Sequence, residues 1–262
     1  MTTLLIDGDL LLYRSSSATE TEIQWDEDNW ILHSNLTESK DLFTTALDGI
    51  TNALGTRSII MCLSDSANFR KDLTPTYKSK RKETRKPIVF RAMLEWIKET
   101  YDPIIKPRLE ADDVLGILAT HPNYSGKCVV VSDDKDMQTL PCSLYRQGEL
   151  KVITEDEADY FWAFQTLTGD STDGYSGCPG IGPKKAESIL AGKPYWPKIV
   201  NTYRKANLTE DDALLNARLA RILRYSDWDV ANQKVKLWTP PSPSSENASD
   251  TNTIPATPNL AA

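Results

Sequence analysis

Three short apolar runs divide the first half of the chain and predict buried strands. They cover residues 4–7, 58–64 and 127–132, and each is rich in Leu, Ile, Val or Cys. Continuous apolar runs of this length are typical of strands covered on both faces, as in a parallel sheet. Longer stretches with helical spacing separate them. The predicted fold class is therefore α/β, with a central, mostly parallel twisted sheet flanked by helices.

The helical stretches are recognised by apolar residues that return every three or four positions. Residues 36–54 and 88–101 have this pattern, and a further helix is expected between Glu110 and Thr120. Residues 18–34 differ, because two apolar-aromatic stretches flank an Asp-Glu-Asp-Asn turn. This arrangement indicates a β-hairpin added to the α/β pattern.

The chain changes character near residue 150. Thr154 with Glu157, and Thr209 with Asp212, have the spacing of capping boxes, and each pair precedes a helical run. From Thr239 onward Pro, Ser, Thr and Asn predominate without an aromatic residue, which is typical of a disordered tail. We therefore predict a core of residues 1–150, a mainly helical region of residues 151–238 and a tail of residues 239–262.

The composition excludes several classes of protein. Of the 262 residues, 40% are hydrophobic and 26% are charged, and no run approaches the roughly 18 apolar residues of a membrane span. The first residues contain Asp7 and Asp9 and no basic leader, which argues against a secretory signal and favours a cytoplasmic protein. The four cysteines are scattered without a CxxC pair, so we expect reduced thiols rather than a zinc site.

Nine carboxylates gather in five short clusters, and three of the clusters follow the predicted strands. Asp7 and Asp65 follow the first two apolar runs, and Asp134 and Asp136 follow the third. A single Asp after a strand is more often a turn or a helix cap, but the carboxyl ends of parallel strands meet at one sheet edge. Such crowded like charges need cations, and Mg2+ is the obvious choice for oxygen ligands. The other five carboxylates are Glu110, Asp112, Asp113, Asp170 and Asp173.

The last two clusters also have simpler interpretations. Glu110, Asp112 and Asp113 fall at the start of a predicted helix, where acidic residues commonly complement the helix dipole. Asp170 and Asp173 lie in a Gly-bounded loop that could be an ordinary turn. Only in combination with the strand-end carboxylates do these five acids favour a metal site.

The charge is unevenly distributed. The net charge is −7, but the segment from Arg70 to Arg91 holds nine Lys and Arg against Asp72 and Glu83, which makes it +7 and the remainder −14. Such a block is either a solvated helix face or an element that contacts phosphates. Within it, aromatic and cationic residues alternate, a mixture that fits an unpaired nucleic-acid end. These residues are Phe69, Arg70, Tyr77, Lys78 and Arg81.

A glycine turn near residue 180 predicts a contact with duplex DNA. Gly180 and Gly182 would form a tight turn that opens onto a helix, and Lys184 and Lys185 lie in its first turn. Free backbone amides and lysines at such a position can receive a phosphate without reading the bases. This is the helix-hairpin-helix pattern.

Five motifs, in this order, resemble the 5′ nuclease superfamily of flap endonucleases and 5′-3′ exonucleases. They are LLIDGD, SDSANFRKDLTPTYKSKR, LEADD, SDDKDMQTL and GDSTDGYSGCPGIGPKKA, and together they span most of residues 1–225. The size and the short tail are most similar to the exonucleases of short-tailed bacteriophages. The resemblance implies a PIN-like nuclease core, a basic helical arch at about residues 69–91 and a C-terminal helix-hairpin-helix region.

The resemblance also implies a role for each candidate residue. One Mg2+ region would comprise Asp7, Asp65, Glu110, Asp112 and Asp113, and the other Asp134, Asp136, Asp170 and Asp173. Asp133 falls outside the family pattern. Lys78 and Arg81 would contact the scissile phosphate, with Arg70 and Tyr77 nearby. Gly174 replaces the usual Asn of the family, and Tyr175-Ser176 replaces Ile-Pro, which puts the geometry of that loop in question.

The implied function is a Mg2+-dependent 5′ to 3′ exonuclease on duplex DNA, with flap endonuclease and RNase H-like primer-removal activity in phage replication. Mn2+ would substitute for Mg2+, K+ would bind at the helix-hairpin-helix, and the protein would act as a monomer in the host-cell cytoplasm on DNA and RNA-DNA hybrids. Two alternatives remain: a PIN-like ribonuclease, and a non-catalytic DNA-binding protein selective for structure. The glycine turn argues against the first and the full set of carboxylates against the second.

Overall fold

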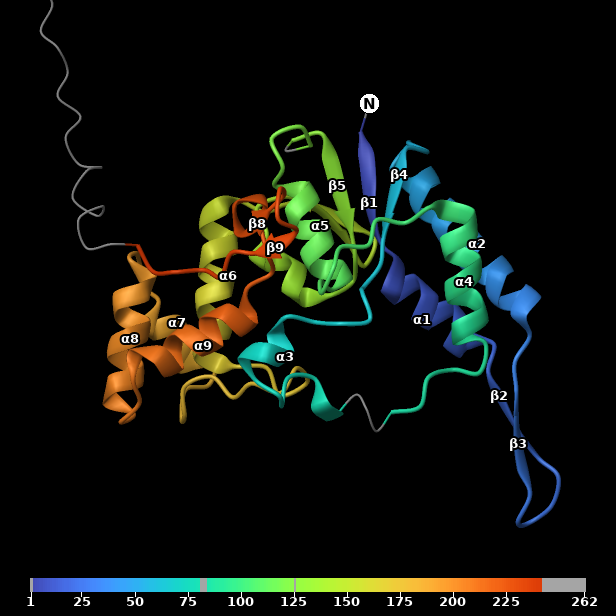
Figure 1. Cartoon of the computed structure of the whole chain (residues 1–262), viewed down its shortest axis with the longest axis horizontal. Helices are drawn as coiled ribbons and strands as arrows, with labels where there is room; N and C mark the ends of the chain where they lie inside the picture. Colours follow the sequence, from blue (N-terminus) through green and yellow to red (C-terminus); the bar gives the residue numbers. More distant parts are fainter. Residues whose placement is uncertain (1, 81–83, 125, 242–262) are drawn as a thin grey trace, which may run out of the picture.

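The chain folds around a five-stranded sheet, as the computed structural model shows for residues 2–80, 84–124 and 126–241 (Figure 1). The strand order is β4-β1-β5-β6-β7, in which β4, β1, β5 and β6 are parallel and β7 is antiparallel to β6. The predicted α/β class with a mostly parallel sheet is thereby confirmed. The strands of the sheet are β1 (Thr3–Asp7), β4 (Ile59–Cys62), β5 (Cys128–Val131), β6 (Ser143–Arg146) and β7 (Glu149–Val152).

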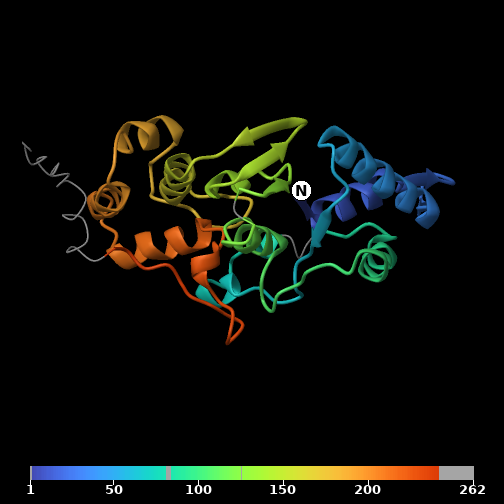
Figure 2. The ribbon, with the colours of Figure 1, turned by 90° about the horizontal axis from the view of Figure 1, so that it is seen from above.

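Helices cover both faces of this sheet (Figures 1 and 2). In β1, Leu4 and Ile6 face a core shared with α1, α2 and α4, whereas Leu5 faces the core under α5. This alternation follows from the pleat of a strand, which points successive side chains to opposite faces. These helices are α1 (Gly8–Ala18), α2 (Leu36–Ala53), α4 (Phe90–Tyr101) and α5 (Ala111–Ala119).

The predicted hairpin is confirmed. β2 (Thr21–Gln24) and β3 (Trp30–His33) pair antiparallel, and all eight residues are exposed. In Figure 1 the hairpin extends away from the sheet and its helices. Its turn is ordered by Asp26, whose carboxylate accepts hydrogen bonds from the backbone of Asp28 and Asn29.

A second helical cluster follows the sheet. Both predicted capping boxes are present: Thr154 caps α6, and Thr209 caps α9. The cluster has its own core, to which Trp162, Ile199 and Tyr203 contribute. The helices are α6 (Glu155–Thr168), α7 (Pro183–Ile189), α8 (Tyr195–Lys205) and α9 (Glu210–Ala220), followed by the 3-10 turn η3 (Tyr225–Asp227) and the short strands β8 (Trp228–Asp229) and β9 (Lys234–Val235).

The division at residue 150 stays a prediction. A boundary there falls inside β7, and Ile222, Leu223 and Trp228 from the end of the chain pack into the core under α5. The expected tail lies outside the described residues from residue 242 onward. Within the described part of the chain, no helix is both long and apolar enough to span a membrane.

The basic segment contains little helix where the structure describes it. α3 (Arg70–Leu73) is a single turn, turns follow to Lys80, and α4 begins only at Phe90. Arg81, which was expected to contact the scissile phosphate, lies outside the described residues.

Candidate active site

The carboxyl ends of β1 and β5 bring the first acids together. Asp7 is the last residue of β1 and caps α1, where one of its oxygens accepts a hydrogen bond from Leu10 N at 3.0 Å. Its other oxygen accepts from the Ser132 hydroxyl, 2.6 Å away. Ser132 Oγ in turn accepts from Asp134 N at 3.1 Å, so one serine after β5 ties Asp7 to Asp134.

These acids are crowded and poorly hydrated. Burial is the main cause that raises the pKa of Asp7 to about 6; the charges of Asp9 and Asp134 act in the same direction, and the hydrogen bonds from Ser132 and Leu10 oppose them. Burial and the charge of Asp7 raise the pKa of Asp112 in the same direction. Such raised values are expected where carboxylates face one another without a neutralising cation.

Asp136 is held from the helical cluster. It lies in the 3-10 helix η2 (Lys135–Thr139), where Asp134 Oδ1 accepts its backbone N–H at 2.9 Å. Gln165 on α6 donates from Nε2 to Asp136 Oδ1 at 2.5 Å. Burial and the charge of Asp134 raise the pKa of Asp136 to about 6. Gln165 was not predicted, because it lies on α6, outside the SDDKDMQTL motif that contains Asp136.

Glu110 connects the two predicted metal regions. It accepts hydrogen bonds from Lys78 Nζ at 2.6 Å and from the Tyr77 hydroxyl at 3.0 Å. Burial opposes the charged form, but Lys78 and Arg70 lower the pKa of Glu110 to about 2. Lys78 Nζ also lies 3.4 Å from Asp173 Oδ2. The two groups of acids therefore form one continuous site rather than separate ones.

The loop that holds Asp170 and Asp173 contacts the site through Lys135 and Lys78. Lys135 Nζ donates to Asp170 Oδ2 at 2.7 Å, and this contact lowers the pKa of Asp170 although the residue is buried. Asp173 O accepts from Lys78 N at 2.8 Å. Gly174 has φ +81°, and a Cβ there would lie 2.7 Å from Thr76 O. Gly174 stands where the family usually has Asn, and because glycine has no Cβ this loop can lie directly against residues 76–78.

Two candidate ligands accept hydrogen bonds from other residues of the chain. Asp65 accepts hydrogen bonds from Arg108 N and Ser66 N, both at 2.7 Å, and the Arg108 contact is the main cause of its lowered pKa. Asp113 is fully buried and is paired with Arg70. Asp133, which the sequence analysis set aside, pairs with Arg14 and accepts from Gln147 N at 2.6 Å.

One further acid faces the site. Asp9 accepts from Ser64 N at 3.3 Å, and burial raises its pKa, with a smaller contribution from the charge of Glu110. Its position two residues after Asp7 in the LLIDGD motif was the available signal. No three of the acids, histidines or cysteines in the described ranges stand close enough to hold an ion as placed. The donor set consists of hard carboxylate oxygens, which is the chemistry of a Mg2+-type cation.

The expected base-stacking residues are buried in this structure, and contact of Arg70 and Tyr77 with DNA stays a prediction. Tyr77 and Phe69 are 3% and 7% exposed, and the Arg70 guanidinium carbon lies 4.7 Å from the Phe69 ring centroid. The aromatic rings therefore pack against the chain's own cations. In this conformation neither Arg70 nor Tyr77 is accessible to DNA.

The glycine turn has the expected local form. Gly180 has φ +73°, and Gly182 is the N-cap of α7, whose first residue is Pro183. Lys184 and Lys185 are exposed, and Lys185 Nζ donates to Gly180 O at 2.9 Å. DNA contact at this turn remains a prediction.

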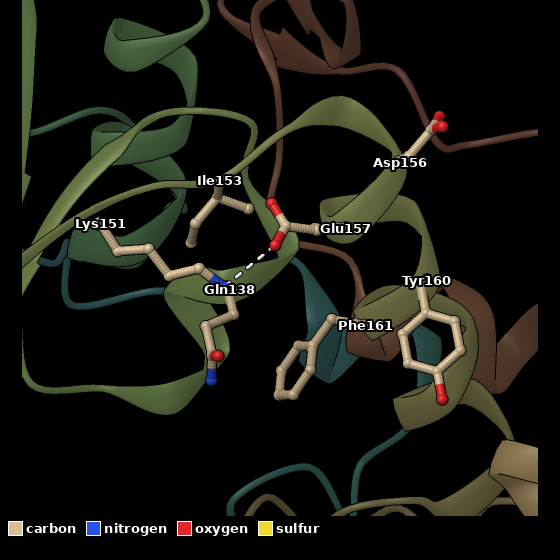
Figure 3. Close-up of a pocket in the computed structure, with 7 residues that line it drawn as sticks. All are labelled: Gln138, Lys151, Ile153, Asp156, Glu157, Tyr160 and Phe161. Atoms are coloured by element: carbon tan, nitrogen blue, oxygen red, sulfur yellow. Dashed lines mark ion pairs between the residues drawn. The ribbon is translucent and has the colours of Figure 1, made fainter.

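Two pockets differ in their relation to the acids. The one in Figure 3 has a volume of ≈ 370 Å³ and contains the Lys151–Glu157 ion pair, but none of the candidate site residues. The other, of ≈ 430 Å³, lies between α1, α2 and the end of β5, and Asp7 and Ser132 are part of its wall. Only the second pocket adjoins the acids.

Comparison with known proteins identifies the family of this chain. Residues 2–160 match the family model of the 5′-3′ exonuclease N-terminal resolvase-like domain. The chain is 31% identical to the exodeoxyribonuclease of Enterobacteria phage T3 over 91% of this chain and 93% of that protein. It is 30% identical to the exonuclease of Escherichia phage T7 over 90% of this chain and 93% of that one. The chain therefore belongs to the 5′-3′ exonuclease family.

A solved structure supports the same fold. The flap endonuclease of bacteriophage T5, in a complex with DNA and metal ions, superposes with a TM-score of 0.59 over 84% of this chain and 89% of that one, at 16% sequence identity. At this identity the likeness concerns the fold. It confirms the arrangement of sheet and helices that brings the acids together.

Proposed function

We propose that this phosphodiester hydrolase is a divalent-metal-dependent 5′ to 3′ exonuclease on duplex DNA that releases 5′-phosphorylated mononucleotides or short pieces. We extend the proposal to 5′-flap cleavage and to removal of RNA primers from RNA-DNA hybrids during phage replication, by a monomer in the host-cell cytoplasm. The observation that carries it is the acidic site that Lys78 joins across Glu110 and Asp173, in a chain of the 5′-3′ exonuclease family.

The acids supply ligands for Mg2+, with Mn2+ as a substitute. Asp7, Asp112 and Asp134 interact through their charges and would hold one ion with Glu110 nearby. Asp136, Asp170 and Asp173 would hold another. When bound, such ions neutralise the phosphate and the leaving oxygen and make water a better nucleophile at neutral pH. K+ at the Gly180–Gly182 turn is part of the same proposal.

The chain's own cations bring the DNA to these acids. Lys78 carries a positive charge at the centre of the site and would contact the scissile phosphate together with Arg81. Lys184 and Lys185 in the first turn of α7 would contact the backbone of the duplex without reading its bases. The segment from Arg70 to Arg91 would guide the 5′ end, because its charge of +7 opposes the charge of the rest of the chain.

The lengths of the cleavage products distinguish between the possible activities. Blunt, nicked, flapped and RNA-DNA hybrid substrates, labelled at the 5′ or the 3′ end, would be incubated with Mg2+ and resolved by size. We expect short 5′-derived products from duplex ends and cleavage at the junction of flaps. Asp170→Ala should cleave none of them but should still bind 5′-ended DNA in Ca2+. Cleavage by this variant, or products that arise only from RNA, would contradict the proposal.

Asp133→Ala is the matched control. Asp133 lies beside Asp134 but pairs with Arg14 away from the acidic cluster. Its loss should leave the cleavage rate near that of the wild type. A loss of cleavage rate as large as that of Asp170→Ala would show that Asp133 belongs to the active site.

A further inference from the structure

Arg70 is buried and joins three parts of the chain. It is 3% exposed, and its side chain donates five hydrogen bonds. Two of them reach the Asp113 carboxylate, each at 2.7 Å, and one reaches Glu110 Oε2 at 3.1 Å. The other two reach backbone carbonyls at the end of α9, Leu219 O at 3.3 Å and Arg221 O at 2.6 Å. The guanidinium thus connects α3, α5 and the C-terminal helical region.

Asp113 has no acceptor position left for an ion. Its Oδ1 accepts from Arg70 Nη2 at 2.7 Å and Leu223 N at 3.1 Å. Its Oδ2 accepts from Arg70 Nη1 at 2.7 Å and Glu110 N at 3.3 Å. A carboxylate offers about four lone-pair positions, and all four are used. The side chain is also fully buried, so it is not open to the site.

The same pair fixes Glu110. Asp113 accepts the backbone N–H of Glu110, and Arg70 donates to the Glu110 carboxylate. Glu110 in turn accepts from Lys78 and Tyr77. A displacement of Asp113 would therefore move the acid that connects both halves of the site.

We propose that Arg70 and Asp113 are positioning residues, which attach the C-terminal helical region to the acidic site and orient Glu110, and that Asp113 does not bind metal. This proposal rests on the proposed metal-dependent function. It differs from the predictions made from the sequence, in which Asp113 is a metal ligand and Arg70 contacts DNA.

Direct titration with Mn2+ separates the two assignments without relying on cleavage. Mn2+ affinity of the full chain would be measured by calorimetry for Asp113→Asn and, as the matched variant, for the neighbouring Asp112→Asn. We expect Asp112→Asn to weaken Mn2+ binding at least about tenfold, which corresponds to one lost interaction of 1.4 kcal/mol or more. Asp113→Asn should stay within about twofold of the wild type. Equal losses in both variants would overturn the proposal.

The positioning role is tested by comparing the cleavage rates of two single variants with that of the double variant. Asp113→Asn and Arg70→Lys each break the same paired contact, since a single ammonium cannot span two carboxylate oxygens and two carbonyls. Both variants should slow single-turnover cleavage at saturating Mg2+ by a similar factor, and the double variant should be no slower than the slower single one. Multiplying effects would show that the two residues act independently and would contradict the proposal.

A measurement on the wild-type protein covers the case in which the variants do not fold. Crystals soaked in Mn2+ would be examined by anomalous diffraction. We expect the ions among Asp7, Asp112, Asp134 and their neighbours, and none bonded to Asp113. An ion bonded to either Asp113 oxygen would overturn the proposal. If the wild type bound Mn2+ but cleaved no DNA, the proposed function would fail while the placement of Asp113 would still be tested.

Discussion

At the residue scale, Lys78 is the side chain that shows most directly how the acidic site is held together. Its Nζ lies 2.6 Å from Glu110 and 3.4 Å from Asp173, and its backbone N–H donates to Asp173 O. Lys78 has φ +51°, an uncommon conformation for a residue with a side chain. The surrounding contacts must therefore hold it there, which is typical of functional positions.

Lys78→Ala should slow single-turnover cleavage by about two to three orders of magnitude, the usual effect of removing one group that stabilises developing charge. DNA binding should weaken much less, because the rest of the basic segment remains. Rates and dissociation constants would be measured on the same nicked substrate. Lys80→Ala, an exposed neighbour, should behave like the wild type. An unchanged cleavage rate for Lys78→Ala would favour the alternative interpretation, in which the basic segment is only a solvated surface.

The raised pKa of Asp136 predicts how stability depends on pH. Its folded-state pKa is about 6, raised chiefly by burial, against roughly 3.9 in an unfolded chain. The neutral form is favoured on folding, so the contribution to stability is present below about pH 4 and is lost as pH rises through about 6. Asp136→Asn carries no charge and should melt at a higher temperature than the wild type in chelator at about pH 7.5, with the advantage disappearing toward pH 4.

Asp133→Asn should show the opposite sign. Burial opposes the charged form of Asp133, but the hydrogen bond from Arg14 lowers its pKa below the ordinary value. Replacing it removes a favourable charge, so the melting temperature should fall slightly at neutral pH. If both asparagine variants shifted in the same direction, the electrostatic explanation would be wrong.

The sequence predicted which acids matter better than it predicted what each one touches. Asp7, Asp134 and Asp136 follow apolar runs, and their convergence follows from the sheet. Burial of Asp113 was not visible, because its partners Arg70 and Leu223 lie 43 and 110 positions away along the chain. Spacing within a motif reports neighbours on one helix, not contacts from distant segments.

At the element scale, the loop of Asp170 and Asp173 depends on one glycine. Gly174 has φ +81°, and its missing Cβ leaves room for Thr76 O. Gly174→Ala should lower the free energy of unfolding by roughly 1–3 kcal/mol, because both the backbone conformation and the contact become strained. Urea denaturation would measure the loss.

Gly148 provides the matched control for this prediction. It has φ +84°, and nothing lies within 4 Å of a Cβ placed there. Gly148→Ala therefore carries the backbone cost without the steric contact, and it should be less destabilising than Gly174→Ala. Equal losses would show that the contact with Thr76 is unimportant.

Elements with strong patterns were predicted, and short polar ones were not. The three apolar runs, the hairpin and the capped helices all appear in the structure. β6 and β7 were missed because their residues, SLYR and ELKV, form no continuous apolar run; one residue of β6 is buried and none of β7. The aromatic residues of the basic segment were predicted to stack on bases; their packing against Arg70 in this structure was not visible in the local pattern.

At the scale of the whole molecule, the glycine turn and the acidic site lie in different parts of one chain. Lys184→Ala with Lys185→Ala should weaken duplex binding equally for all sequences and should reduce the slope of log Kd against log salt by about 2, one for each lost phosphate contact. Binding would be measured over a series of salt concentrations. Lys98→Ala on α4, which lies across the molecule from α7 in Figure 1, should leave the slope unchanged.

The distant partners of Arg70 predict when a newly made chain becomes active. Leu219 and Arg221 lie 149 and 151 positions after Arg70, so a growing chain on the ribosome carries most of its acids long before Glu110 can be fixed. Activity should therefore arise in one late step, once residue 223 has emerged, rather than gradually. Ribosome-bound chains of increasing length, assayed on labelled DNA, would show that step. The nuclease would thus act only as a nearly finished molecule.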